Sequence, residues 1–205
     1  MLTLAFDTAT DVATVALLRD GDVLGERTTK AARLLADAEE LCAEAGVAPA
    51  DLDALVAGTG PGGYTGLRMG LVTARVLSFS LGLDAAGVST LDALAAGAPG
   101  AEPLLDARRG QVFARGEDGA PRVLAPEVLD VVAGTTYVGD GAVRYRELVE
   151  AAGGVVPPDD SDLHVPWARH HAALARDFGS AERLEPLYLR EPDAERSLRE
   201  GRLRT

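Results

Sequence analysis

Hydrophobic runs of strand length open the chain, with short polar turns between them. Residues 2–6, 12–18 and 23–28 carry the apolar and β-branched side chains typical of strands. Asp20-Gly21 separates the second run from the third, and this dipeptide favours a hairpin because both turn residues must adopt positive φ. The pattern predicts three antiparallel strands at the start of the chain.

The same pattern returns about a hundred residues later. A run over residues 103–105 ends at Asp106, a second covers residues 111–114, and Asp118-Gly119 makes the next turn. In each copy a helical stretch then precedes a strand that enters a glycine-containing loop, at residues 55–58 and 136–139. The repeat predicts two related lobes.

The repeated unit is three antiparallel strands followed by alternating helix and strand. Two such units predict an α/β chain of the actin-like, ribonuclease H-like class. The breaker-rich stretch at residues 97–101 places the boundary, giving a first lobe over residues 1–100 and a smaller second lobe over residues 101–205. A last helix is expected near residues 166–178, and the terminal segment is expected to pack back on the first lobe.

A glycine-rich loop at residues 58–70 follows a strand and opens a long apolar helix. Such a junction leaves backbone N–H groups at the positive end of a helix, where an anion binds favourably. The loop lacks the Gly-Lys-Ser/Thr ending of a Walker A motif. A phosphate site and a tight structural turn both remain open from the sequence.

Small residues recur at helical spacing through that helix, at Gly63, Gly66, Gly70 and Ala74. Such a stripe lets another element approach closely, which is either the chain's own sheet or a partner helix. On the partner interpretation, Gly70→Arg is expected to block association and leave the monomer folded. The preceding helix, near residues 31–44, carries apolar residues at the same spacing.

Charge and composition narrow the function classes. Asp and Glu outnumber Lys and Arg by 32 to 20, so the surface repels phosphate backbones and direct tRNA binding is not expected. Cys42 is the only cysteine, which excludes an intrachain disulfide and favours a core position. No run is long and apolar enough for a membrane span, so we expect a cytoplasmic protein. The Arg-containing tail after residue 190 favours a solvated terminus over a tRNA contact.

The glycine loop also carries a family resemblance. Residues 60–70, Gly-Pro-Gly-Gly-Tyr-Thr-Gly-Leu-Arg-Met-Gly, resemble the signature Gly-Pro-Gly-Ser-Phe-Thr-Gly-Leu-Arg-Ile-Gly of the TsaB (YeaZ) family, the dimerization subunits of tRNA threonylcarbamoyladenosine biosynthesis. Residues 4–10, 105–113 and 186–190 agree as well, so the resemblance spans nearly the whole chain.

This resemblance implies an actin-like fold and a non-catalytic role. The implied partner is a larger TsaD-type paralogue, which transfers threonylcarbamoyl to the anticodon-adjacent adenosine of ANN-decoding tRNAs. A TsaE-type ATPase completes the implied assembly, the chain alone is expected to form a homodimer, and tRNA is bound only indirectly. No tightly bound cofactor is implied, and ADP or ATP is expected only at the junction of the complex.

The first-lobe helices form the pairing surface in the family. Carried over to this sequence, the partner-interface residues are Leu34, Leu41, Gly63, Tyr64, Gly66, Leu67, Gly70 and Ala74. Two departures affect this surface. The His-Ser pair that many relatives carry before the first helix is absent from residues 29–32, and Gly63-Tyr64 replaces the usual Ser-Phe.

The expected cleft between the lobes holds the residues that a nucleotide would approach, which are Asp7, Thr8, Gly60, Gly62 and Asp106. Ala9 stands where active phosphotransferases of this fold need a glycine. The histidines lack the His-x-x-x-His spacing of the catalytic paralogue, so no metal site is expected. Aspartates at strand ends also commonly cap turns, and both interpretations of Asp7 and Asp106 stay open.

Two other functions compete with the partner-subunit interpretation. One is an ATP-dependent small-molecule kinase on the same fold, for which residues 138–141, Val-Gly-Asp-Gly, are the candidate second phosphate loop. The other is a stand-alone homodimeric binding protein, which would use the same helical surface.

Overall fold

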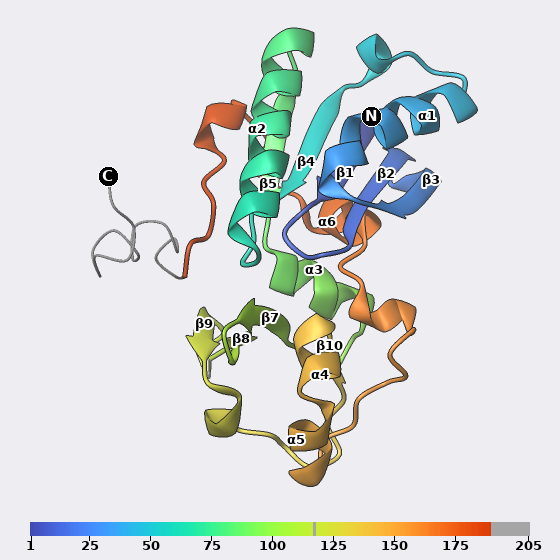
Figure 1. Ribbon diagram of the computed structural model, residues 1–205. Coiled ribbons are helices and arrows are strands. Elements are labelled where there is room, and N and C mark those ends of the chain that lie inside the picture. Colours follow the sequence, from blue (N-terminus) through green and yellow to red (C-terminus); the bar gives the residue numbers. More distant parts are fainter. Residues whose placement is uncertain (117, 190–205) are drawn as a thin grey trace, which may run out of the picture.

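In the computed structural model, which describes residues 1–116 and 118–189, a five-stranded mixed sheet forms the first lobe (Figure 1). Its order is β3-β2-β1-β4-β5, with β1 antiparallel to β2 and parallel to β4. Asp20 and Gly21 both adopt positive φ in the β2–β3 turn, as the hairpin prediction requires. The strands are β1 Leu2–Asp7, β2 Ala13–Arg19, β3 Asp22–Thr29, β4 Ala54–Gly58 and β5 Asp84–Val88.

Helices cover both faces of this sheet, which explains why its central strands are apolar at nearly every position. Helices α1 (Leu34–Glu44) and α2 (Tyr64–Leu81) pack on one face against side chains such as Phe6 and Leu55. Helix α6 (Ala168–Leu174) packs on the other face against Ala5 and Val56. Gly82, at φ 69°, ends α2 in the left-handed conformation.

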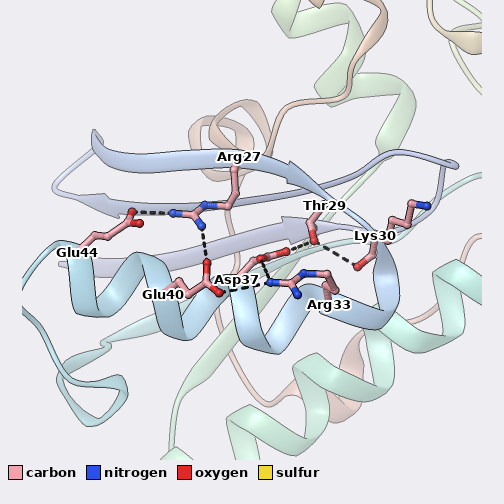
Figure 2. Close-up of polar contacts among 7 residues, drawn as sticks. All are labelled: Arg27, Thr29, Lys30, Arg33, Asp37, Glu40 and Glu44. Carbon is pink, nitrogen blue, oxygen red and sulfur yellow. Dashed lines mark hydrogen bonds and ion pairs between the residues drawn. The ribbon is translucent and has the colours of Figure 1, made fainter.

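A network of charged side chains joins the edge strand β3 to α1 (Figure 2). Arg27 binds Glu40 and Glu44 at 2.8 and 2.6 Å. Arg33 binds Asp37 and Glu40, and the hydroxyl of Thr29 donates to Asp37. The acidic side chains Asp37, Glu40 and Glu44 of α1 are thus paired with arginines of the same chain.

The second lobe is smaller and its sheet is divided. β7 (Leu105–Arg108), β8 (Gln111–Arg115) and β9 (Pro121–Leu124) form an antiparallel sheet, while β6 (Glu102–Pro103) pairs with β10 (Tyr137–Val138). The predicted strand over residues 103–105 is therefore interrupted at Leu104, whose N–H bonds to Val138. Helices α4 (Asp140–Arg144) and α5 (Arg146–Ala151) follow, with a break at Tyr145.

Helix α3 (Thr90–Gly97) and the segment before α6 carry the chain between the lobes. Leu91 and Leu94 of α3 pack with Leu105 and Phe113 of the second lobe. After α6 the chain runs back along α2, as the red segment of Figure 1 shows. Gly179 forms a bridge to Ala85 of β5, and residues 181 and 184 enter the first-lobe core.

Candidate interlobe site and partner surface

A cleft of about 420 Å³ lies between the lobes, where the β1–β2 turn faces the β7–β8 turn and α4. Its wall includes Thr8 and Gly62 of the first lobe and Asp106 of the second. These three are among the residues predicted from the sequence to lie where a nucleotide would approach. The structure does not bring Asp7 and Gly60 to this wall. Both are buried beneath it.

The Asp7 carboxylate is enclosed by the chain's own donors. Its Oδ1 accepts the N–H of Ala9 at 2.6 Å, and its Oδ2 accepts the hydroxyl of Thr90 at 2.6 Å. His171 Nε2 lies 2.7 Å from the same Oδ2, in ion-pair rather than hydrogen-bond geometry. A Cβ on Gly58 would come within 2.3 Å of this carboxyl, so glycine makes room for it. Asp7 is therefore a buried structural group.

Burial alone would raise the pKa of Asp7. The charge and proximity of His171, together with the bonds from Thr90 and Ala9, outweigh burial and lower this pKa below its ordinary value of 3.8. Asp7 is thus held ionised inside the protein. Thr90 and His171 were not predicted from the sequence, because they lie 83 and 164 residues after Asp7.

The second-lobe carboxylates, in contrast, line the cleft. Asp106 pairs with Arg108 and Arg144 at 3.1 and 3.4 Å, and its N–H donates to Asp140 at 2.8 Å. Burial raises the pKa of Asp140 from 3.8 to about 6, and the negative charge of Asp106 adds to the effect. Arg108 also binds Asp11 at 2.5 Å and so joins the two lobes across the cleft.

The glycines of the long loop provide close packing. A Cβ on Gly62, Gly66 or Gly70 would come within 2.1 to 2.3 Å of Thr8 or Ala9 of the β1–β2 turn. That turn also accepts the N–H of Gly63 at 2.6 Å and donates the Thr8 hydroxyl to Gly66. The chain's own turn packs closely against these glycines, which favours the structural interpretation of the loop.

The candidate second phosphate loop is packed in the same way. A Cβ on Gly139 would meet the carbonyl oxygen of Leu104 at 2.2 Å, and one on Gly141 would meet Leu105 at 2.7 Å. The N–H of Gly139 donates to His164. These glycines hold α4 against β6 and β7, which favours a structural role for this loop as well.

Most residues expected at the partner interface lie inside the first lobe. The buried members are Leu34, Leu41, Leu67, Gly70 and Ala74, and Gly66 is half-buried against Thr8. The predicted stripe therefore faces the chain's own sheet and turn, which is one of the two alternatives that the sequence left open. Gly63 and Tyr64 remain exposed.

The opposite side of α2 carries exposed apolar side chains that the sequence analysis did not select. Met69, Val72, Val76 and Phe79 are 40%, 55%, 58% and 92% exposed. Their spacing of three, four and three residues places them on one side of the helix. A helix that is apolar on both sides is a sequence signal for a second contact surface. We call these four residues the α2 outer face.

An aromatic and cationic cluster borders the beginning of α2. The rings of Tyr64 and Tyr188 lie 5.3 Å apart, and Arg68 lies over Tyr64 and donates to its hydroxyl at 2.6 Å. Arg75, seven residues further along α2, donates to the carbonyl oxygen of Leu184 at 2.6 Å. The segment after α6 thus flanks the α2 outer face.

The remaining sequence expectations concern cysteine, metals and membranes. Cys42 is buried in the core, and burial raises the pKa of its thiol, as its predicted core position implies. Within residues 1–116 and 118–189, no three His, Cys, Asp or Glu side chains are grouped to hold a metal ion. Over the same residues, no helix has the length and hydrophobicity to cross a bilayer.

Comparison with known proteins gives consistent matches over most of the chain. Residues 27–144 match the family model TsaD, tRNA N6-adenosine threonylcarbamoyltransferase. The tRNA threonylcarbamoyladenosine biosynthesis protein TsaB of Escherichia coli is 32% identical, over 93% of this chain and 95% of that protein. An uncharacterised protein of Mycobacterium tuberculosis is 40% identical, over 93% and 92% of the two chains.

A solved structure matches as well. YeaZ from Pseudomonas aeruginosa superposes with a TM-score of 0.74 at 29% identity, over 92% of this chain and 99% of that chain. Together with the family match, this likeness confirms the predicted ribonuclease H-like, actin-like fold class.

Proposed function

Because this chain belongs to the TsaB (YeaZ) family of tRNA threonylcarbamoyladenosine biosynthesis proteins, we propose that it is the non-catalytic partner subunit of a TsaD-type threonylcarbamoyltransferase. In this role it binds and stabilises the catalytic subunit, and the transfer to tRNA takes place on that subunit. A TsaE-type ATPase and a nucleotide at the subunit junction belong to the same proposal.

The α2 outer face is the observation that carries the proposal. A helix that buries one side in its own lobe and exposes a row of apolar side chains on the other favours contact with another protein. A few well-packed residues near the centre of an interface carry most of its binding energy. The flanking Tyr64, Arg68 and Tyr188 belong to the residue types enriched at such contacts.

The interlobe cleft supports a role without chemistry of its own. Its first-lobe carboxylate is enclosed by Ala9, Thr90 and His171, and its glycine loops are packed against the chain. Asp106 is paired with two arginines. Overall negative charge favours a protein partner over direct contact with a phosphate backbone.

Binding of the purified chain to the TsaD-type subunit from the same cell tests this proposal. Light scattering after size-exclusion chromatography gives the mass of each complex, and titration calorimetry gives its Kd. Val76→Glu places a charge in the α2 outer face and is expected to weaken binding by about 100-fold or more. Gly70→Arg is unsuitable, because any side chain at Gly70 meets Thr8 inside the lobe.

Val132→Glu is the matched control, since Val132 is also 58% exposed but lies in the second lobe. It is expected to leave the Kd unchanged. Equal affinity of the Val76→Glu and parent chains would overturn the assigned surface. A parent chain that forms only homodimers and never a mixed complex would contradict the partner-subunit role and favour a stand-alone binding protein.

A further inference from the structure

The chain crosses between the lobes twice, and both crossings pass the same buried carboxylate. It leaves the first lobe through α3, whose first residue is Thr90, and it returns through the segment that enters α6, which carries His171. Thr90 and His171 are both fully buried, and both contact Oδ2 of Asp7. Asp7 itself ends the central strand β1.

Each partner of Asp7 belongs to a different part of the molecule. α3 packs through Leu91 and Leu94 into the second lobe, whereas α6 packs through Ala168 on the first-lobe sheet. The Ala9 N–H, which binds Oδ1, belongs to the β1–β2 turn at the cleft. One carboxylate thus connects the sheet, the outgoing helix, the returning helix and the cleft wall.

Other contacts at the joint hold the same segments. The N–H of Thr90 donates to Gly60 at 2.8 Å, and the hydroxyl of Thr14 donates to Pro166 at 2.9 Å. His171 Nδ1 lies 3.3 Å from the carbonyl oxygen of Trp167. These contacts fix the side chains around Asp7 so that the carboxylate meets them without reorganisation.

We propose that Asp7 is a positioning residue, which fixes the orientation of the two lobes by binding Thr90 of the outgoing helix and His171 of the returning helix. The end of β1 thus serves the joint between the lobes. Helices α3 and α6 also pack directly on each other. Removal of the carboxylate takes away the polar contacts that fix their relative position and allows the second lobe to turn relative to the first.

The distance between the lobes is the direct test, and it needs neither tRNA nor a partner protein. Spin labels at Glu39→Cys on α1 and Glu147→Cys on α5 report this distance by pulsed electron resonance, in a Cys42→Ala background. Both positions are exposed. The parent chain is expected to give one narrow distance distribution, and Asp7→Asn to shift and broaden it.

Thr90→Val removes a single hydroxyl and replaces Asp7→Asn in the distance measurement if Asp7→Asn does not fold. Thr3→Val is the matched control, because it makes the same change at a buried position of β1, and it is expected to leave the distance unchanged. Hydrogen exchange is expected to increase in α3 and α6 of the Asp7 and Thr90 variants. A folded Asp7→Asn or Thr90→Val chain with the parent distance distribution, even with a lower Tm, would overturn the proposal.

The result of this distance measurement can be told apart from the result of the partner-binding test. A loss of lobe orientation together with normal partner binding supports the positioning role alone. An unchanged orientation together with normal partner binding leaves only the subunit proposal standing.

Discussion

Asp7 and Asp106 occupy the same place in the two copies of the repeat, yet their surroundings differ. Asp7 is the last residue of β1 and Asp106 is the second residue of β7, and each of these strands begins an antiparallel triple in its lobe. Asp7 is sealed in the joint by Thr90 and His171, while Asp106 lies at the cleft and binds the half-exposed Arg108 and Arg144.

The difference shows that a repeated motif does not repeat its role. Strands β1 to β3 of the first lobe are six to eight residues long, and β1, which lies under helices on both faces, is buried at every position including Asp7. Strands β7 to β9 of the second lobe are four or five residues long and form a separate sheet, so Asp106 lies at the cleft. Its side chain is only 4% exposed, but the two arginines that it binds are each 52% exposed. Packing around a residue decides whether its charge serves structure or remains available to a ligand.

The largest effect is expected from removing each carboxylate in turn. Asp7→Ala leaves His171 and Thr90 buried without their partner, and loss of one member of a buried pair costs about 3–5 kcal/mol. Asp106→Ala removes ion pairs to two arginines that are each 52% exposed, and because solvent can take over part of these contacts a smaller loss is expected. Urea denaturation of both variants measures the difference in the free energy of unfolding. Equal losses would show that the two sites do not differ as described.

A second contrast is in the pH dependence of stability. The pKa of Asp140 is raised from 3.8 to about 6 by burial, so its contribution to stability is full below about pH 4 and is lost as the pH rises through about 6. This difference corresponds to about 3 kcal/mol. Asp140→Asn is therefore expected to stabilise the chain at pH 7 by up to about 3 kcal/mol and to flatten its stability between pH 4 and 6.

The contribution of Asp7 to stability depends on pH with the opposite sign. Its pKa is lowered in the folded chain, so its contribution is present above the unfolded value of 3.8 and is lost on further acidification. Unfolding titrations from pH 3 to pH 7 separate the two groups. A parent chain and an Asp140→Asn variant with parallel stability curves above pH 4 would contradict the assignment of Asp140.

The smallest effect is expected from the ion pair that crosses the cleft. Asp11 and Arg108 are both exposed, and pairs of this kind contribute about 0–1 kcal/mol. Asp11→Asn is expected to lower Tm slightly at low salt and to have no effect at 1 M salt, because salt screens exposed charges. Thermal unfolding at the two salt concentrations checks this. A salt-independent loss would mean that the contact is not mainly electrostatic.

Local pattern predicted the first lobe well and the second lobe less well. The predicted strands at residues 2–6, 12–18 and 23–28 match β1, β2 and β3 to within one residue at each end. Their apolar runs and the Asp20-Gly21 turn are local signals. In the second lobe, the run at residues 103–105 divides between two sheets at Leu104, because its hydrogen-bond partners lie far along the chain.

The candidate site depended still more on distant residues. Asp7 was predicted to face the cleft, but Thr90 and His171 enclose it, and no local pattern connects these three positions. The small residues of α2 were correctly placed on one side of a helix, but the sequence left open whether that side meets the chain itself or a partner, and it packs on the chain's own turn. The apolar residues on the other side, from Met69 to Phe79, were a readable signal.

The central claim is that this chain supports threonylcarbamoyl transfer through its surface and without cleft chemistry. Formation of modified adenosine in tRNA, reconstituted with the TsaD-type and TsaE-type subunits, tests it most directly. The double variant Asp106→Asn, Asp140→Asn is expected to retain the parent rate, and Val76→Glu is expected to lose it together with partner binding. A double variant that binds the partner normally but no longer supports modification would contradict the claim and place chemistry in the cleft.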